Sequence, residues 1–173
     1  MKKIKIIGVF IIFLLSFISH FMYEWFPSNF FSIFFPVNES IWEHMKLIVT
    51  PVLFFSIFEN ILYRNKNILV NNFILSYSIS IVLGIVIYLI LYLPIHYMIG
   101  HNIFISIGLL FIIFMIIEII SYYIMKYRDI KYSRIIGLGI IVIMYIIFGY
   151  LTYNPPKNDL FYDTSKNIYG IQK

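Results

Sequence analysis

The chain contains no cysteine in its 173 residues. Disulfides and thiolate metal sites are therefore excluded, and a metal ion would need histidine and carboxylate ligands. Charge is also scarce, since Asp, Glu, Lys and Arg make up 12% of the residues while 61% are hydrophobic. With a mean hydropathy of +0.90, the chain has too little polar surface to enclose a soluble globule. Lipid is the solvent that this composition predicts.

Several functional signatures are missing as well. The sequence has no HExxH motif, no serine nucleophile elbow, no paired-aspartate motif, and no internal repeat of the kind that many transporters show. The net charge of +5 does not indicate nucleic-acid binding, because most aromatic residues lie inside apolar runs and the basic residues sit in short loops. We expect an integral membrane protein that does not bind nucleic acid.

Five apolar segments have about the 17 to 25 residues that a helix needs to cross a bilayer. They run from Ile4 to Phe21, Lys46 to Tyr63, Leu69 to Pro94, Ile103 to Met125, and Ile135 to Tyr153. The first resembles a signal peptide, but no small-x-small cleavage site follows it, so we expect an uncleaved anchor. The fold class predicted is an all-α membrane protein, a bundle of about five transmembrane helices.

Basic residues divide unevenly between the two faces of such a bundle. Nine fall on one side and four on the other: Lys2, Lys3, Lys5, Arg64, Lys66, Lys126, Arg128, Lys131 and Arg134 against Lys46, Lys157, Lys166 and Lys173. The positive-inside rule then predicts a cell-membrane protein with its N-terminus inside and its C-terminus outside. We expect a transmembrane domain over residues 1–153 and a polar extracytoplasmic tail over residues 154–173 that packs on the outer face.

One further apolar run, Phe30 to Phe35, is too short to cross the membrane. It can lie in the interface, or enter the membrane and return while packed against protein. The sequence leaves both alternatives open.

Polar residues of ligand type gather on the predicted outer side. We expect eight of them to form one site: His20, Glu24, Asn38, Glu39, Glu43, His44, His101 and Asp163. His20, Glu43, His44 and His101 are the candidate metal ligands, because imidazole and carboxylate groups suit Zn²⁺ or another divalent ion. For His101 the alternative is a solvated loop in which Asn102 caps the next helix.

The segment from Pro36 to Lys46 also has a purely structural interpretation. Ser40 followed by Glu43 fits a capping box, in which Ser40 caps the amides at a helix start and Glu43 reaches back to the Ser40 amide. Trp42 then acts as an interfacial anchor, and Lys46 extends its amine to the membrane surface.

Two acidic residues fall within predicted spans. Glu59 has Asn60, Arg64 and the lipid headgroups within about one turn. Glu118 is deeper and has fewer partners nearby in sequence. An intramembrane acid is a candidate functional group, so Glu118 indicates either a polar contact between helices or a role in transport or proton relay.

The chain resembles an uncharacterised bacterial membrane family, domain of unknown function 6512. The resemblance lies in His20 to Glu24, in Phe35 to Leu47, in Gly100-His101-Asn102, and in a tail with Pro155-Pro156, Leu160-Phe161, Asp163 and Tyr169-Gly170-Ile171. It implies a multi-helix membrane fold. It implies no substrate, cofactor or catalytic residue, but the matching blocks all fall on the predicted outer side.

Three functions follow as hypotheses. The first is a membrane protein whose His/Glu-rich outer pocket binds a small ligand or a membrane-protein partner. The second is a membrane-embedded, metal-assisted hydrolase that acts on lipid or envelope-precursor headgroups. The third is a component of a transporter that uses Glu118.

Overall fold

The computed structural model describes residues 1–100 and 102–171. Within them lie seven α-helices, one 3₁₀ turn and a two-stranded antiparallel sheet. Their bounds are α1 Lys2–Trp25, α2 Asn29–Phe34, α3 Ile41–His44, α4 Lys46–Asn65, α5 Phe73–Ile99, α6 Ile103–Lys126, α7 Ser133–Tyr153, η1 Asp159–Phe161, β1 Tyr162–Asp163 and β2 Ile168–Tyr169.

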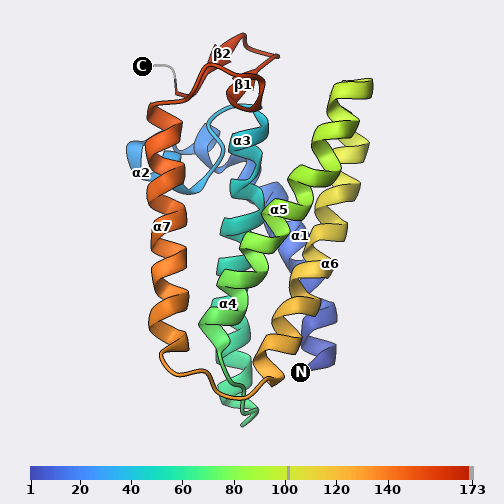
Figure 1. Cartoon of the computed structure of the whole chain (residues 1–173), viewed down its shortest axis with the longest axis vertical. Helices are drawn as coiled ribbons and strands as arrows, with labels where there is room; N and C mark the ends of the chain where they lie inside the picture. The colour runs from blue at the N-terminus through green and yellow to red at the C-terminus, as the bar shows by residue number, and fades with distance from the viewer. Residues whose placement is uncertain (101, 172–173) are drawn as a thin grey trace.

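Five helical stretches of the described chain are long and apolar enough to cross a membrane, which confirms the predicted fold class. They are α1, α3 with α4, α5, α6 and α7. The start of α1 and the strand β2 lie at opposite ends of the bundle (Figure 1). Large apolar side chains cover its outside, with exposed fractions of 63% for Leu14 and 68% for Ile135. A surface of that kind is stable in lipid rather than in water. The chain is an all-α multi-pass membrane protein.

The predicted bounds of the third span need correction at both ends. Helix α5 begins at Phe73, because Asn72 takes a left-handed conformation and its side chain bonds Arg128 O and Ile130 N at 3.0 and 2.9 Å. Leu69, where we expected the span to start, is 97% exposed and lies outside the helix. At the other end the helix continues through Pro94 to Ile99. The apolar run alone could not show that a turn fastened by Asn72 precedes the helix.

Helix α4 carries the largest share of the core. Its residues 46–52 are all buried, and Ile48, Val49 and Val52 are fully covered. Helices α5 and α7 pack closely at Gly137, where a Cβ would lie 2.7 Å from the backbone nitrogen of Leu75. Any larger residue there would push the two helices apart.

The short apolar run becomes helix α2, which does not cross the bundle. It lies against α7 near the end that carries the C-terminal tail, here called the tail end (Figure 1). The Ser32 and Tyr153 hydroxyls join the two helices at 2.8 Å. The loop from α2 to α3 and the strands β1 and β2 cover the same end, so polar segments from distant parts of the sequence meet there.

Candidate metal centre

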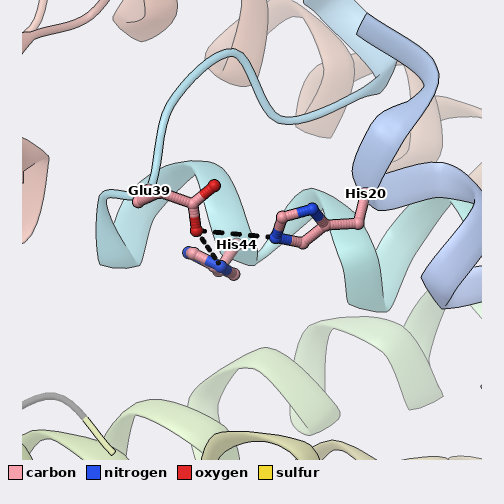
Figure 2. A group of neighbouring side chains, drawn as sticks. All are labelled: His20, Glu39 and His44. Carbon is pink, nitrogen blue, oxygen red and sulfur yellow. Dashed lines mark ion pairs between the residues drawn. The ribbon is translucent and has the colours of Figure 1, made fainter. Parts of the chain in front are cut away.

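Three ligand-type side chains meet at the tail end of the bundle. His20 comes from α1, Glu39 from the loop before α3, and His44 from the last residue of α3 (Figure 2). Glu39 Oε2 lies 3.5 Å from His20 Nε2 and 3.3 Å from His44 Nε2. One ligand atom from each of the three lies within 4.8 Å of the others, so this group could hold a metal ion.

The His44 ring is held by a backbone contact. Its Nδ1 lies 2.9 Å from the carbonyl oxygen of Ser40, one helical turn earlier. A carbonyl can only accept, so Nδ1 carries a proton and donates it. A neutral His44 would then turn the lone pair of Nε2 toward the Glu39 carboxylate, whereas a protonated His44 would donate a hydrogen bond to it. The neutral arrangement is unfavourable unless a cation lies between them, and it is the arrangement that second-shell contacts give to metal-binding histidines.

Glu39 is ionised over the ordinary pH range. Hydrogen bonding to His20, and then to His44, holds the pKa of its carboxyl well below the usual range. Its side chain is 41% exposed, against 29% for His20 and 15% for His44. The carboxylate is therefore in the form that a metal ligand requires and is open to solvent on one side.

Two cavities adjoin the group, and Glu39 lines both. The smaller, about 130 Å³, is also lined by His44, by His96 and by tail residues such as Ser165. The larger, about 460 Å³, is lined by His20 and Glu24 and by Lys166 of the tail. A ligand could therefore approach the three side chains from either side.

The tail is fastened to the loop that carries Glu39. Asn38 donates from Nδ2 to Gly170 O at 2.8 Å, and the Glu39 amide donates to Asp163 Oδ2 at 2.9 Å. Burial tends to raise the pKa of Asp163, but hydrogen bonds from Ser165 and from backbone amides outweigh it, and the pKa lies below its ordinary value. Asn38 and Asp163 therefore position the site rather than contact an ion.

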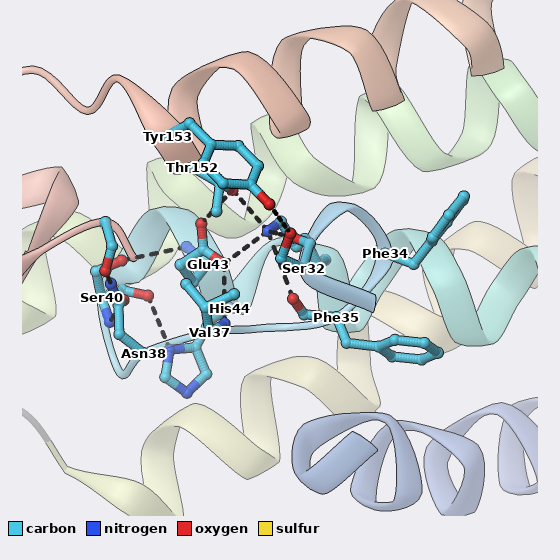
Figure 3. Close-up of polar contacts among 12 residues, drawn as sticks. Ser32, Phe34, Phe35, Val37, Asn38, Ser40, Glu43, His44, Thr152 and Tyr153 are labelled. Atoms are coloured by element: carbon cyan, nitrogen blue, oxygen red, sulfur yellow. Dashed lines mark hydrogen bonds and ion pairs between the residues drawn. The ribbon is translucent and has the colours of Figure 1, made fainter. Parts of the chain in front are cut away.

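Glu43 does not belong to the group of His20, Glu39 and His44, although it was one of the candidate ligands. Its Oε2 lies 2.6 Å from Nζ of Lys46, and its Oε1 accepts from Thr152 Oγ1 of α7 at 2.7 Å (Figure 3). Lys46 is 0% exposed and also donates to Ser32 O at 2.7 Å. The expectation that Lys46 reaches the membrane surface is wrong, because Glu43 and these oxygens satisfy its charge inside the protein.

The expected capping box is half correct. The Ser40 side chain does accept from the Glu43 amide, at 3.3 Å. Glu43 does not reach back to the Ser40 amide, which instead donates to Asn38 Oδ1 at 2.9 Å (Figure 3). The Glu43 carboxylate contacts Lys46 rather than the Ser40 amide, because a charged donor forms the stronger hydrogen bond.

Trp42 lies among aromatic side chains of the tail end. Its ring centroid is 5.1 Å from that of Phe148 on α7 and 4.9 Å from that of Phe161 in η1. It thus joins the bundle to the tail, in addition to any role at the membrane interface.

The remaining candidates do not belong to the group of His20, Glu39 and His44. Glu24 is exposed in the wall of the larger cavity. Glu59 is 0% exposed and pairs with Lys5 rather than with Arg64 or lipid headgroups, and Glu118 faces the same lysine. His101 lies outside the described residues. The sequence argument named His20 and His44, which lie in this group, as candidate ligands. It did not name Glu39 as one, and it overlooked the buried partners of Lys5 and Lys46.

Comparison with known protein families identifies the family of this chain. The model of a family of unknown function, DUF6512, matches residues 1–171. The chain belongs to this family. No curated protein and no solved structure matches it. Membership of DUF6512 covers the membrane bundle, the three ligand-type residues and the tail together, and it assigns no activity to any of them.

Proposed function

We propose that this DUF6512 member is a cell-membrane protein that binds a divalent metal ion, Zn²⁺ by preference, through His20, Glu39 and His44 on its outer face. The observation that carries the proposal is one oxygen of Glu39 facing the Nε2 atoms of both histidines. Two imidazoles and a carboxylate are ligands that zinc takes in proteins.

The spacing of these atoms also fits an ion held between them. Two ligands about 2.1 Å from a tetrahedral zinc lie about 3.4 Å apart. The two Glu39-to-histidine distances are 3.5 and 3.3 Å. The contact of His44 Nδ1 with Ser40 O further leaves Nε2 as the ligand atom.

Three protein ligands leave a fourth position on a tetrahedral ion. The two cavities beside Glu39 give that position room for a bound group. We therefore propose that the outer pocket binds a small ligand or the exposed group of a membrane partner, with the ion as its anchor.

A second candidate function, a metal-assisted hydrolase, is favoured by the same three-ligand set. Catalytic zinc sites keep three protein ligands and a water whose pKa falls to about 7. Glu24 lines the cavity that is also lined by His20 and Glu39, and we propose it as the carboxylate that would accept a proton from a water bound there. Lipid or envelope-precursor headgroups are the substrates expected at the outer end of a membrane bundle. A transporter component would instead depend on Glu118.

Metal analysis of the protein purified in detergent tests the proposal. After exposure to Zn²⁺ and removal of the excess, we expect stoichiometric zinc in the unaltered protein. His20→Gln, Glu39→Gln and His44→Gln should each reduce it by at least about tenfold, since removing one ligand of three weakens the site strongly.

Matched controls come from the same end of the bundle. His96→Gln removes a histidine that lines the smaller cavity outside the metal group, and Glu24→Gln removes a carboxylate from the larger one. Both variants should keep the metal. Zinc that stays bound in all three ligand variants, or that never binds the unaltered protein, would refute the proposal.

A further inference from the structure

A second group of charged side chains is buried at the opposite end of the bundle, near the chain's N-terminus. Lys5 of α1, Glu59 of α4 and Glu118 of α6 are 5%, 0% and 2% exposed. The Lys5 Nζ lies 2.9 Å from Glu59 Oε2 and 3.0 Å from Glu118 Oε2. Two ionised carboxylates with one ammonium would leave a net negative charge inside a membrane bundle, which is costly.

Glu59 is fully supplied with hydrogen-bond donors. It accepts from Lys5 Nζ, from the Tyr77 hydroxyl at 2.6 Å and from the Tyr63 hydroxyl at 2.7 Å. The other two ammonium protons of Lys5 go to Ser121 Oγ at 2.8 Å and to the Tyr77 oxygen at 3.1 Å. Three donors around one carboxylate stabilise its ionised form, so Glu59 is the counter-ion of Lys5.

Glu118 is supplied less well with hydrogen-bond donors than Glu59. Its buried Oε2 forms the ion pair with Lys5 Nζ at 3.0 Å but accepts no hydrogen bond from the described residues. Its Oε1 lies 3.3 Å from the Tyr77 hydroxyl, whose one hydrogen is engaged in the shorter bond to Glu59. A proton on Oε1 would change this, because Glu118 would then donate to the Tyr77 oxygen and the group would be neutral overall.

A cavity at the surface of the bundle gives access to Glu118. It has a volume of about 570 Å³, lies between α1 and α6, and is lined by Lys5 and Glu118 and by apolar side chains such as Phe10 and Phe111. Lys2, at the start of α1, also lines it, so the cavity extends to the end of the bundle. Glu59 is not among its lining residues.

We propose that Glu118 is a proton-binding site reached through the cavity between α1 and α6. Binding a proton makes the buried group neutral, and releasing it leaves one uncompensated negative charge beside Lys5. The charged and titratable groups that line the cavity or surround Glu118 are Lys2 and Lys5 on α1, Glu59 and Tyr63 on α4, Tyr77 on α5, and Tyr122 and Tyr123 on α6. The site is independent of the metal group at the tail end.

Labelling with dicyclohexylcarbodiimide tests the proposal, since this apolar reagent adds to protonated carboxyl groups. Peptide mapping by mass spectrometry on the full chain in detergent should place the adduct on Glu118. The label should fall several-fold as the pH is raised from acid to alkaline. No adduct at Glu118, an adduct on Glu59 instead, or labelling of Glu118 that is independent of pH would overturn the proposal.

Two variants test whether Glu118 is the protonated carboxyl group. Glu118→Gln should abolish the adduct and keep the fold, because the amide mimics the neutral acid. Glu59→Gln should reduce labelling of Glu118, since Glu118 would then be the sole carboxylate beside Lys5 and would ionise. Increased labelling of Glu118 in the Glu59→Gln variant would contradict the donor assignment. Because the adduct is mapped in the unaltered protein, the test stands even if a variant fails to fold.

Discussion

The ammonium of Lys46 and the carboxylate of Glu43 lie 2.6 Å apart and are 0% and 1% exposed. The same pair reaches Ser32 on α2 and Thr152 on α7, so it holds the α2 loop, α4 and α7 together. Breaking a buried pair by removing one partner typically costs about 3 to 5 kcal/mol, because the other charge is left uncompensated.

We therefore expect Lys46→Met to lower the free energy of unfolding by about 3 to 5 kcal/mol. The double variant Lys46→Met with Glu43→Gln should lose less than Lys46→Met alone, since no unpaired charge remains. Unfolding in a mild detergent, followed by circular dichroism, measures these two variants and the single variant Glu43→Gln. A double variant that loses the sum of the two single effects would show that the pair is not coupled.

The tail should detach when Gly170 is replaced. Gly170 has φ +60°, and a Cβ there would lie 2.5 Å from Thr152 O. Lys157 and Lys166 are exposed but lie in the fastened tail. Trypsin should therefore cleave after them several-fold faster in Gly170→Ala than in the unaltered protein. Gly139→Ala is the control, because a Cβ at Gly139 meets nothing within 4 Å. Equal cleavage of the two variants would argue against a fastened tail.

Acid should weaken the attachment of the tail. The pKa of Glu39 is lowered by His20 and then His44, and that of Asp163 is lowered by Ser165 and backbone amides despite its burial. A carboxyl group with a lowered pKa contributes stability that is present above its unfolded pKa, about 4, and is lost as the pH falls through the folded value.

We thus expect the tail to become protease-sensitive below about pH 4 and to be protected at neutral pH. Pepsin cleavage of the tail, measured over an acid pH series, follows this change. Asp163→Asn should make the tail sensitive already at neutral pH, where trypsin can be used. If acid sensitivity in the Asp163→Asn variant equalled that of the unaltered protein, Asp163 would not be the responsible group.

The orientation of the bundle is also a prediction. Nine of the thirteen basic residues fall on one side, so the N-terminus should be inside. The chain has no cysteine, and single cysteines at Asn65 and Asn158 would lie exposed at opposite ends. An impermeant thiol reagent on intact cells should label the cysteine at position 158 and spare that at position 65. The reverse pattern would invert the topology.

The five spans could be predicted because apolar length alone defines a membrane helix. The meeting of His20 and His44 was also predictable in part, since both fall at the same end of the bundle. Lys46 could have been paired with Glu43 from their spacing of three residues, which places them on one helical face. Because the surrounding sequence is apolar, we expected Lys46 to extend its amine to the membrane surface instead.

The contacts of Lys5 could not be predicted. Its partners Glu59 and Glu118 lie 54 and 113 positions away, and only the packing of α1 against α4 and α6 brings them together. Lys5 was counted among the basic residues that set the orientation, because its position beside Lys2 and Lys3 is typical of a membrane-surface charge. Helix packing, which a single sequence does not specify, decides between these two roles.

The most direct test of the metal centre is X-ray absorption at the zinc edge of the loaded, purified protein. We expect a shell of nitrogen and oxygen ligands at about 2.0 to 2.2 Å, with the outer-shell scattering of two imidazoles. His44→Gln should lower the imidazole count to one in whatever zinc remains, while His96→Gln should leave it at two. A spectrum without imidazole scattering, or one that His44→Gln does not change, would contradict zinc binding by His20, Glu39 and His44.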